Sequence, residues 1–188
     1  TAGIASSYAK GVAALAQHAD VTPLVQNTGE EGKGAAALFV TSGEAFLAKH
    51  DLRDEVFGPA SLLVACRDME QLLAITESLE GQLTATLQMD AGDLEDARRL
   101  LPVLERRVGR ILANGFPTGV EVSTAMVHGG PFPATSDGRS TSVGTAAINR
   151  FLRPVSYQNL AQDLLPEALR DDNPLGIWRR KDGVLGKE

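Results

Sequence analysis

The sequence predicts an α/β fold in which a parallel-rich sheet is flanked by helices. Three stretches with strand character, SLLVACRD, LTATLQM and GRILANG, follow one another over Ser61–Asn114. Helical segments separate them, and strands joined through helices by such short connections are parallel with right-handed crossovers. The first stretch is apolar without alternation, which is typical of a strand covered on both faces. No internal repeat is evident.

The elements before this region follow from hydrophobic spacing. Residues 2–19 form a predicted helix, because apolar side chains recur at helical intervals at Ile4, Tyr8, Val12 and Leu15. We expect this helix to end before Thr22-Pro23. A glycine-rich approach, GEEGKG, then leads to a strand at 36–41 and a short helix at 42–49. GEEGKG lacks the spacing of a phosphate-binding loop, so an ordinary turn is the better interpretation.

Acidic residues mark the helix starts inside the predicted α/β region. Asp68 suits an N-cap, with Gln71 three residues later as its capping-box partner. Asp93 and Asp96 have the same offset before the next helix, which Pro102 should bend. Cys66 falls in the first apolar stretch, where we expect an inert, buried side chain.

The chain changes character after Asn114. Residues 115–146 hold six glycines and three prolines without a periodic pattern, yet keep apolar residues, which indicates an ordered functional loop. Alternation at Phe151, Arg153, Val155 and Tyr157 then predicts a strand, which should lie at a sheet edge or carry a bulge because of Pro154. We expect another subunit, or another part of a longer protein, to cover that edge.

These patterns divide the chain into three parts. Residues 1–147 form an expected α/β domain, 148–158 an edge strand and 159–188 a tail. We expect the tail to hold a short helix at 161–169 and to be loosely ordered beyond it unless Trp178 docks. The first residue, Thr1, already lies in a helical pattern, so we expect a piece of a longer protein.

Composition excludes several classes of function. The net charge is −6 and no basic block occurs, so neither nucleic acid nor a membrane surface is an expected partner. The apolar stretches are too short to span a bilayer. One cysteine allows no internal disulfide and suits the cytoplasm. The three histidines, at 18, 50 and 128, lack metal-ligand spacing, so no metal site is expected.

One motif carries more specific information. Glu55-Val56-Phe57-Gly58-Pro59, ahead of an apolar strand and a helix, resembles the signature of the aldehyde dehydrogenase superfamily. Downstream, GQLTATLQ and GRILANG resemble later strands of that family in the same order. The stretch from Asn114 to Asn159 is similar to the branch that oxidises alpha-ketoglutaric semialdehyde (2,5-dioxopentanoate) to 2-oxoglutarate. The resemblance covers nearly the whole chain and identifies it as a C-terminal portion.

The resemblance implies a chemistry and a set of site residues. Members attack an aldehyde with a cysteine thiolate, pass hydride to NAD or NADP, and hydrolyse the thioester with a glutamate base. Glu55 would bind the nicotinamide ribose hydroxyls and Phe57 would lie against the nicotinamide. Val120, His128 and Gly129 would lie at the substrate entrance. Residues 1–147 would form a partial catalytic domain, and 148–158 would be an oligomerisation strand that joins a homo-oligomer.

The sequence departs from the family pattern at the decisive groups. Cys66 follows the Glu55–Pro59 motif, whereas the family nucleophile precedes it, and the base glutamate and the dinucleotide-binding domain are missing. We therefore expect no catalytic residue here and no activity from this chain alone. Two alternatives stay open: a dehydrogenase for another aldehyde, fatty or another semialdehyde, and a stand-alone interaction module that pairs through the 151–157 strand.

Overall fold

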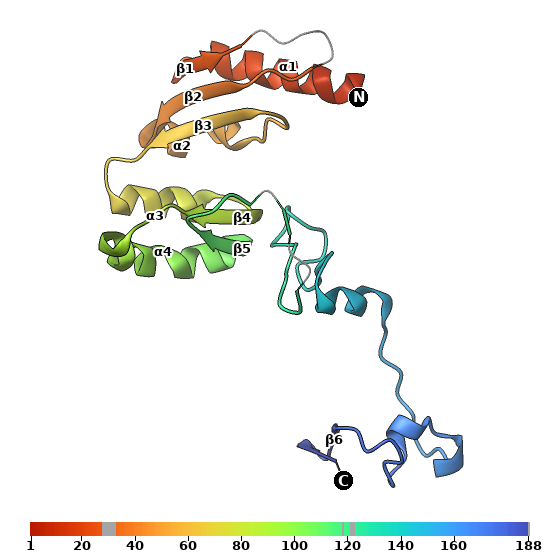
Figure 1. Ribbon diagram of the computed structural model, residues 1–188. Helices are drawn as coiled ribbons and strands as arrows, with labels where there is room; N and C mark the ends of the chain where they lie inside the picture. Colours follow the sequence, from red (N-terminus) through yellow and green to blue (C-terminus); the bar gives the residue numbers. More distant parts are fainter. Residues whose placement is uncertain (28–32, 118, 121–122, 188) are drawn as a thin grey trace. The chain divides into compact units, whose positions relative to one another are not determined.

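The computed structural model describes residues 1–27, 33–117, 119–120 and 123–187 (Figure 1). The chain divides into two compact units, Thr1–Arg150 and Phe151–Glu188. Most of the expected GEEGKG turn lies outside the described residues. No helix in the described part is long and apolar enough to cross a membrane.

The first unit begins with a helix and a three-stranded sheet. Helix α1 (Ala2–Gln17) precedes the strands β1 (Val21–Gln26), β2 (Ala37–Ser42) and β3 (Ala60–Ala65). The strand order is β1-β2-β3, with β1 antiparallel to β2 and β2 parallel to β3. Strand β1 was not predicted, because Pro23 lies inside it. The register shifts between Pro23 and Val25, and the strand lies at an edge, where proline is tolerated.

The core of this sheet forms around Phe39 of β2, whose side chain is fully buried. Helix α2 (Gly43–Ala48) follows β2 directly, and the Ser42 hydroxyl caps it by accepting a hydrogen bond from the Ala45 amide at 3.1 Å. A short 3-10 helix, η1 (His50–Arg53), then leads toward β3. The buried members of the core cluster are Val21, Ala37, Phe39, Phe46, Leu52 and Ile75.

The expected single parallel sheet over Ser61–Asn114 is wrong in one respect. Helix α3 (Met69–Ser78), β4 (Gln82–Leu87), helix α4 (Leu94–Arg107) and β5 (Val108–Ala113) follow in the predicted order. Strands β4 and β5 pair in parallel, but as a separate two-stranded sheet that does not include β3. The sequence pattern indicated strands and direction, but did not show which strands are neighbours.

Strand β3 is also not covered on both faces by the described residues. Its side chains alternate between half-buried and exposed, and Leu63 is 49% exposed. The strand ends at Ala65, so Cys66 follows it rather than lying inside it, and that side chain is half-buried.

The helix caps agree with the sequence at one position and differ at the other. Asp68 caps α3 as predicted, accepting a hydrogen bond from the Gln71 amide at 2.8 Å. Asp93 occupies the N-cap position of α4 as predicted, but its side chain makes no cap hydrogen bond to that helix. Its side chain instead forms a capping box with Asp90 at the start of a 3-10 turn, η2 (Ala91–Asp93).

The glycine-rich loop after β5 packs directly on the β4–β5 sheet. The Gly81 amide donates a hydrogen bond to the Phe132 carbonyl at 3.2 Å. A Cβ at Gly109 would lie 1.9 Å from the Gly129 carbonyl oxygen, so the backbones approach too closely for any side chain. The described part of the loop is therefore ordered against the sheet, as the sequence predicted.

The expected oligomerisation strand does not form in this chain. A 3-10 helix, η3 (Thr145–Phe151), occupies the first part of the 148–158 segment, and residues 152–158 are neither helix nor strand. No other strand in the described residues pairs with this segment, and a strand needs a partner for its backbone groups.

The tail differs from the prediction in two places: a hairpin forms near its end, and no α-helix forms before it. The predicted helix at 161–169 is wrong: two 3-10 turns, η4 (Gln162–Leu164) and η5 (Glu167–Leu169), flank Pro166, which cannot donate inside a helix. Strands β6 (Arg179–Lys181) and β7 (Val184–Gly186) form a hairpin.

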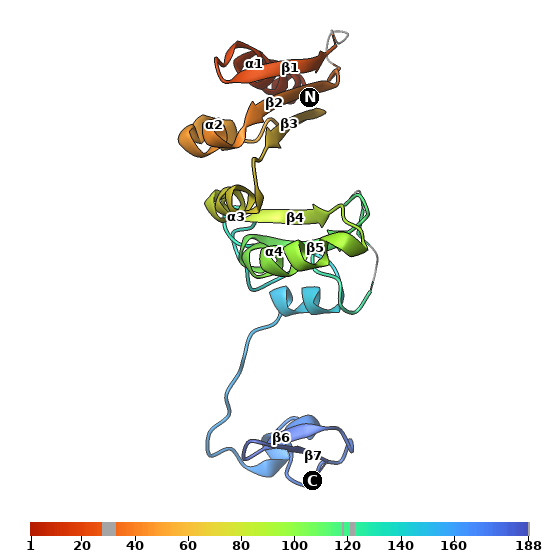
Figure 2. The same ribbon diagram turned by 90° about the vertical axis from the view of Figure 1, so that its left-hand side faces the viewer.

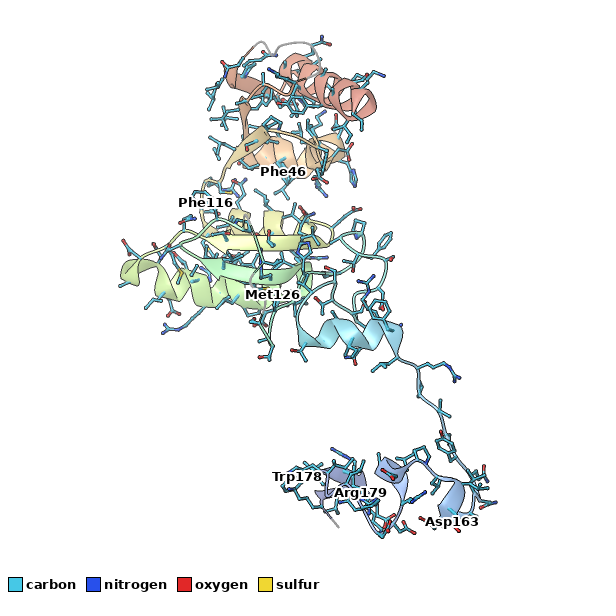
Figure 3. The ribbon with its side chains drawn as sticks, turned by 45° about the vertical axis from the view of Figure 1, so that its right-hand side comes forward. Phe46, Phe116, Met126, Asp163, Trp178 and Arg179 are labelled. Carbon is cyan, nitrogen blue, oxygen red and sulfur yellow. The ribbon has the colours of Figure 1, made fainter. Side chains whose placement is uncertain are left out.

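Asp182 and Gly183 have positive φ angles, as the two-residue turn of this hairpin requires. An Asp-Gly pair is typical of such a turn, and this sequence signal was missed. The Trp178 ring is 64% exposed, with the Lys187 ammonium 5.7 Å from its centre (Figure 3).

Candidate functional site

The Glu55–Pro59 motif lies between η1 and β3, and its second residue, Val56, points into the protein. Val56 is half-buried and packs against α1, where a Cβ at Gly11 would lie 2.9 Å from the Val56 Cγ1 atom. Its neighbours on both sides, Glu55 and Phe57, are exposed, and the Phe57 side chain is 68% exposed. Alternation along an extended segment explains this arrangement: an inward residue leaves its neighbours outward.

Helix α1 also fixes the turn that follows. The buried Tyr8 ring lies under Gly58, where an added Cβ would be 2.3 Å from the ring atom Cδ2. The Tyr8 hydroxyl donates a hydrogen bond to the Ala35 carbonyl. The Pro59 carbonyl accepts a hydrogen bond from the Ala37 amide of β2 at 3.0 Å. The turn is therefore held by both α1 and the sheet.

A cavity of about 480 Å³ lies beside the motif. Both predicted cofactor residues, Glu55 and Phe57, line it, together with Leu15 from α1 and the first residues of β3. The walls thus combine two exposed carboxylates, those of Asp54 and Glu55, with one exposed aromatic ring and apolar side chains. A carboxylate only accepts hydrogen bonds when ionised, so it suits hydroxyl groups, and the ring suits a flat apolar or aromatic group. This combination of hydrogen-bond acceptors and a ring is compatible with the expected binding of the nicotinamide-ribose end of a dinucleotide.

The predicted substrate-entrance residues lie elsewhere. His128 is half-buried and lines a second cavity, of about 460 Å³, with Thr135, Ser142 and Arg150 among its walls. The Nδ1 atom of His128 is buried without a hydrogen-bond partner among the described residues.

Two neighbours tie His128 to the loop. The His128 amide donates to the Thr141 hydroxyl at 2.8 Å, and the His128 carbonyl accepts from the Ser142 amide at 3.1 Å. Gly129 is buried against β5. Val120 is 38% exposed and lines none of the cavities described here. The structure therefore brings Glu55 and Phe57 together, but does not bring Val120 to His128.

A third cavity, of about 770 Å³, lies between the motif and β4. Glu55 lines it as well as the first cavity, and Leu83 and Ala134 line it as well as the cavity at His128. These shared walls make the three cavities neighbours along one side of the first unit.

Arg53 is a positioning residue that sequence reasoning missed. Its guanidinium donates to the Leu47 carbonyl at 2.9 Å and to the Ser78 carbonyl at 3.3 Å. It also lies 5.9 Å from the centre of the Phe46 ring. A basic residue two positions before Glu55 was a visible signal, but the sequence did not show that its guanidinium would bind the Ser78 carbonyl of α3, 25 residues away.

Neither a nucleophile nor a metal centre is evident in the described part of the chain. Burial raises the pKa of the Cys66 thiol above its ordinary value of 9.0, and the nearby Asp68 and Glu44 carboxylates add to this. A raised pKa disfavours the thiolate that attacks an aldehyde. No group of three or more His, Cys, Asp or Glu side chains in the described residues is placed to hold a metal ion.

Comparisons with known proteins agree with the fold and the motif. No family model matches the sequence. The chain is 56% identical over 187 residues to alpha-ketoglutaric semialdehyde dehydrogenase 2 of Azospirillum brasilense. It is 50% identical over 186 residues to alpha-ketoglutaric semialdehyde dehydrogenase of Acinetobacter baylyi. Each match covers 97% of this chain but only 35% of the relative, so the chain spans about a third of these proteins.

Solved structures with the same fold include the lactaldehyde dehydrogenase of Escherichia coli, with 18% identity and a TM-score of 0.61 over 81% of this chain and 30% of that one. A structure of PnpE in complex with nicotinamide adenine dinucleotide gives a TM-score of 0.59 at 18% identity, covering 79% of this chain and 29% of that chain. The chain therefore shares its fold with solved structures that include an aldehyde dehydrogenase, and over nearly its whole length it is similar in sequence to part of two alpha-ketoglutaric semialdehyde dehydrogenases.

Proposed function

We propose that this chain is the C-terminal part of an NAD- or NADP-dependent aldehyde dehydrogenase that oxidises alpha-ketoglutaric semialdehyde to 2-oxoglutarate. The observation that carries the proposal is the identity of 56% over nearly the whole chain to a relative of that name. The nucleophile and the base belong to the part of the enzyme outside these residues. The chain alone is inactive.

Within the complete enzyme, this chain contributes residues that bind the nicotinamide-ribose part of the cofactor. The dinucleotide supplies a hydride acceptor when bound. The Glu55 carboxylate accepts hydrogen bonds from the ribose hydroxyls, and the Phe57 ring covers the nicotinamide end. The exposure of both side chains beside one cavity supports these roles. Val120, His128 and Gly129 serve the substrate entrance, which the position of His128 in the wall of a cavity supports.

The 148–158 segment serves homo-oligomer formation in this proposal. Its side chains are largely exposed, with Phe151 82% and Val155 56% exposed, and the described residues provide no strand to pair with it. An exposed apolar segment of this kind needs cover, and a second copy offers a strand of the same kind.

A chimera tests the proposed function directly. The 187 matched residues of the Azospirillum brasilense relative are replaced by this chain, and reduction of NAD and of NADP is measured with alpha-ketoglutaric semialdehyde and with other aldehydes. We expect turnover with the semialdehyde. A folded chimera that is inactive, or that prefers an unrelated aldehyde, would contradict the proposal.

Glu55→Gln in the chimera tests whether Glu55 binds the cofactor. A neutral amide loses charge-assisted hydrogen bonds worth about 1.5–3 kcal/mol, so we expect the rate of hydride transfer to fall roughly ten- to hundredfold. Asp54→Asn is the matched control, because this neighbouring carboxylate lines the same cavity. Equal effects of the two substitutions on the rate of hydride transfer would contradict the proposed role of Glu55 in binding the cofactor.

A further inference from the structure

The segment that follows β5 starts at a fixed place beside the end of β4 (Figure 2). The Asn114 side-chain oxygen accepts a hydrogen bond from the Met89 amide at 2.8 Å, and the Gln88 side chain donates to the Gly115 carbonyl at 3.3 Å. Asn114 has a positive φ of 52°, so the chain turns away from the strand there. We call residues 115–127 the 115–127 loop, of which 118, 121 and 122 lie outside the described residues.

The far end of the 115–127 loop is fixed by close backbone packing. A Cβ at Gly144 would lie 2.2 Å from the Met126 carbonyl oxygen, and Gly144 has a positive φ of 84°, which also favours glycine. The Met126 amide donates to the Ser123 carbonyl at 3.3 Å and closes a turn. Both ends of the loop are therefore anchored to the first unit.

The middle of the loop has far fewer contacts. A Cβ added at Gly119 would meet no atom within 4 Å, so the backbone there is not packed against the protein. Phe116 is an exposed aromatic residue near the start of the loop (Figure 3). Among the described residues, Gly119 makes its hydrogen bond to one side chain, that of Arg110 in β5.

Arg110 joins the middle of the loop to its anchored end. The Nη1 atom of Arg110 donates to the Gly119 carbonyl at 3.0 Å and lies 3.7 Å from the Met126 sulfur atom. One nitrogen therefore bridges Gly119, whose backbone is otherwise unpacked, to Met126, whose backbone packs on Gly144. A guanidinium suits this task, because it stays charged near neutral pH and its donors have a fixed planar arrangement.

The stability of the sheet does not account for arginine at this position. The Arg110 side chain is half-buried, its Nε atom is buried without a hydrogen-bond partner, and none of the described carboxylates forms an ion pair with it. Arg106 and Arg107, just before β5, both pair with Glu77. A buried donor without a partner is unfavourable, and an unbranched apolar side chain would avoid this cost. What the guanidinium adds is its bond to the loop.

We propose that Arg110 is a positioning residue for the substrate entrance, because its guanidinium fixes Gly119 and, through it, the adjacent Val120. The inference rests on the proposed function, in which Val120 serves that entrance. Arg110 acts through the loop and does not need to contact the substrate. If the substrate binds only when the loop is fixed, the apparent affinity falls in proportion to the fraction of molecules in which the loop is released.

Arg110→Met in the chimera with the Azospirillum brasilense relative tests this inference. Methionine retains an unbranched stem but removes the charge and the donors. A hydrogen bond to a charged group shifts an equilibrium roughly ten- to a hundredfold, so we expect KM for the semialdehyde to rise about five- to tenfold. We expect kcat and the KM of the dinucleotide to stay within about twofold, because the loop is not part of the cofactor site. Arg110→Lys retains the charge and a donor, so its KM should lie between the other two.

Arg139→Met is the matched control. It removes the same charge from the same glycine-rich region, but the Arg139 guanidinium pairs with Asp137 within a single turn and does not contact the 115–127 loop. We expect the KM of this variant to equal that of the unsubstituted chimera.

Amide hydrogen exchange, followed by mass spectrometry in the same chimeras, provides a readout that does not depend on activity. We expect peptides from the 115–127 loop to exchange at least about fivefold faster in Arg110→Met than in the unsubstituted chimera or in Arg139→Met, because the charged hydrogen bond is lost. Peptides from β4 and β5 should keep their exchange rates, since Arg110 is not expected to stabilise the sheet.

Four results would overturn the inference. They are unchanged exchange of the loop in Arg110→Met, faster exchange with an unchanged KM, an equal rise in KM for Arg139→Met, and loss of protection throughout β4 and β5. The last result would show that Arg110 stabilises the sheet rather than positions the loop. A folded chimera without any substitution that fails to oxidise the semialdehyde would instead contradict the proposed function, so the two failures are distinguishable.

Discussion

Gly11→Ala tests how helix α1 positions the motif. In a helix, alanine is favoured over glycine by about 0.5–1 kcal/mol. Here the new Cβ would lie 2.9 Å from Cγ1 and 3.0 Å from Cγ2 of Val56, a stiff β-branched side chain that is half-buried. Overpacking of this kind costs about 1–3 kcal/mol. We therefore expect a net loss of about 1 kcal/mol in the free energy of unfolding.

A double-mutant cycle separates the two effects. In a Val56→Ala background the obstructing methyl groups are gone, so Gly11→Ala should stabilise the chain by about 0.5–1 kcal/mol. Gly3→Ala is the matched control, because Gly3 lies in the same helix and nothing lies within 4 Å of the added Cβ. Urea unfolding followed by far-UV circular dichroism measures each variant. The reasoning is refuted if Gly11→Ala has the same effect with Val56 and with Ala at position 56.

Three further predictions concern stability and reactivity. Phe39→Ala should lower the free energy of unfolding by about 3–5 kcal/mol in urea titrations, because this fully buried ring is at the centre of the core; a loss under 1 kcal/mol would be inconsistent with that place. The Gln71 amide and the Arg67 side chain lower the pKa of Asp68 below its ordinary 3.8, so its stabilising effect is present above about pH 4 and is lost as the pH falls below that. Wild type and Asp68→Ala should therefore converge in urea midpoint at low pH, and a constant difference would contradict the cap. The Cys66 thiol should react with iodoacetamide more slowly than glutathione at pH 8, because burial raises its pKa, and a faster reaction would contradict its burial.

Local patterns predicted the elements of the first unit well. Spacing and capping residues indicated α1, β2, α2, β3, α3, β4, α4 and β5 in the right order. The parallel direction of β4 and β5 also followed from their helical connection. These features depend on neighbouring residues, which a single sequence shows directly.

Features that depend on remote partners were not predictable. The separation of β3 from β4 depends on what pairs with their edges, and no residue of either strand encodes that choice. The 151–157 alternation indicated a strand, but a strand forms only where a partner satisfies its backbone. Strand β1 was missed because Pro23 argues against a strand. The strand forms nevertheless, because it pairs with β2 and lies at the sheet edge, where proline is tolerated.

The candidate site shows the same division. The Glu55–Pro59 motif was evident from five adjacent residues, and its exposure beside a cavity is consistent with the predicted cofactor roles, which stay predictions. The contacts of Tyr8 with Gly58 and Gly11 with Val56 were not evident, because they join residues about fifty positions apart.

The Arg53 guanidinium makes the location of Glu55 depend on two helices. It binds carbonyls in the last turns of α2 and α3, where helix dipoles concentrate negative potential, and it precedes Glu55 by two residues. A displacement of either helix end would consequently shift the carboxylate. Substitutions well away from the cavity, at the ends of α2 or α3, should thus move the Glu55 carboxylate, and with it the proposed contact to the cofactor, without altering any residue that lines the cavity.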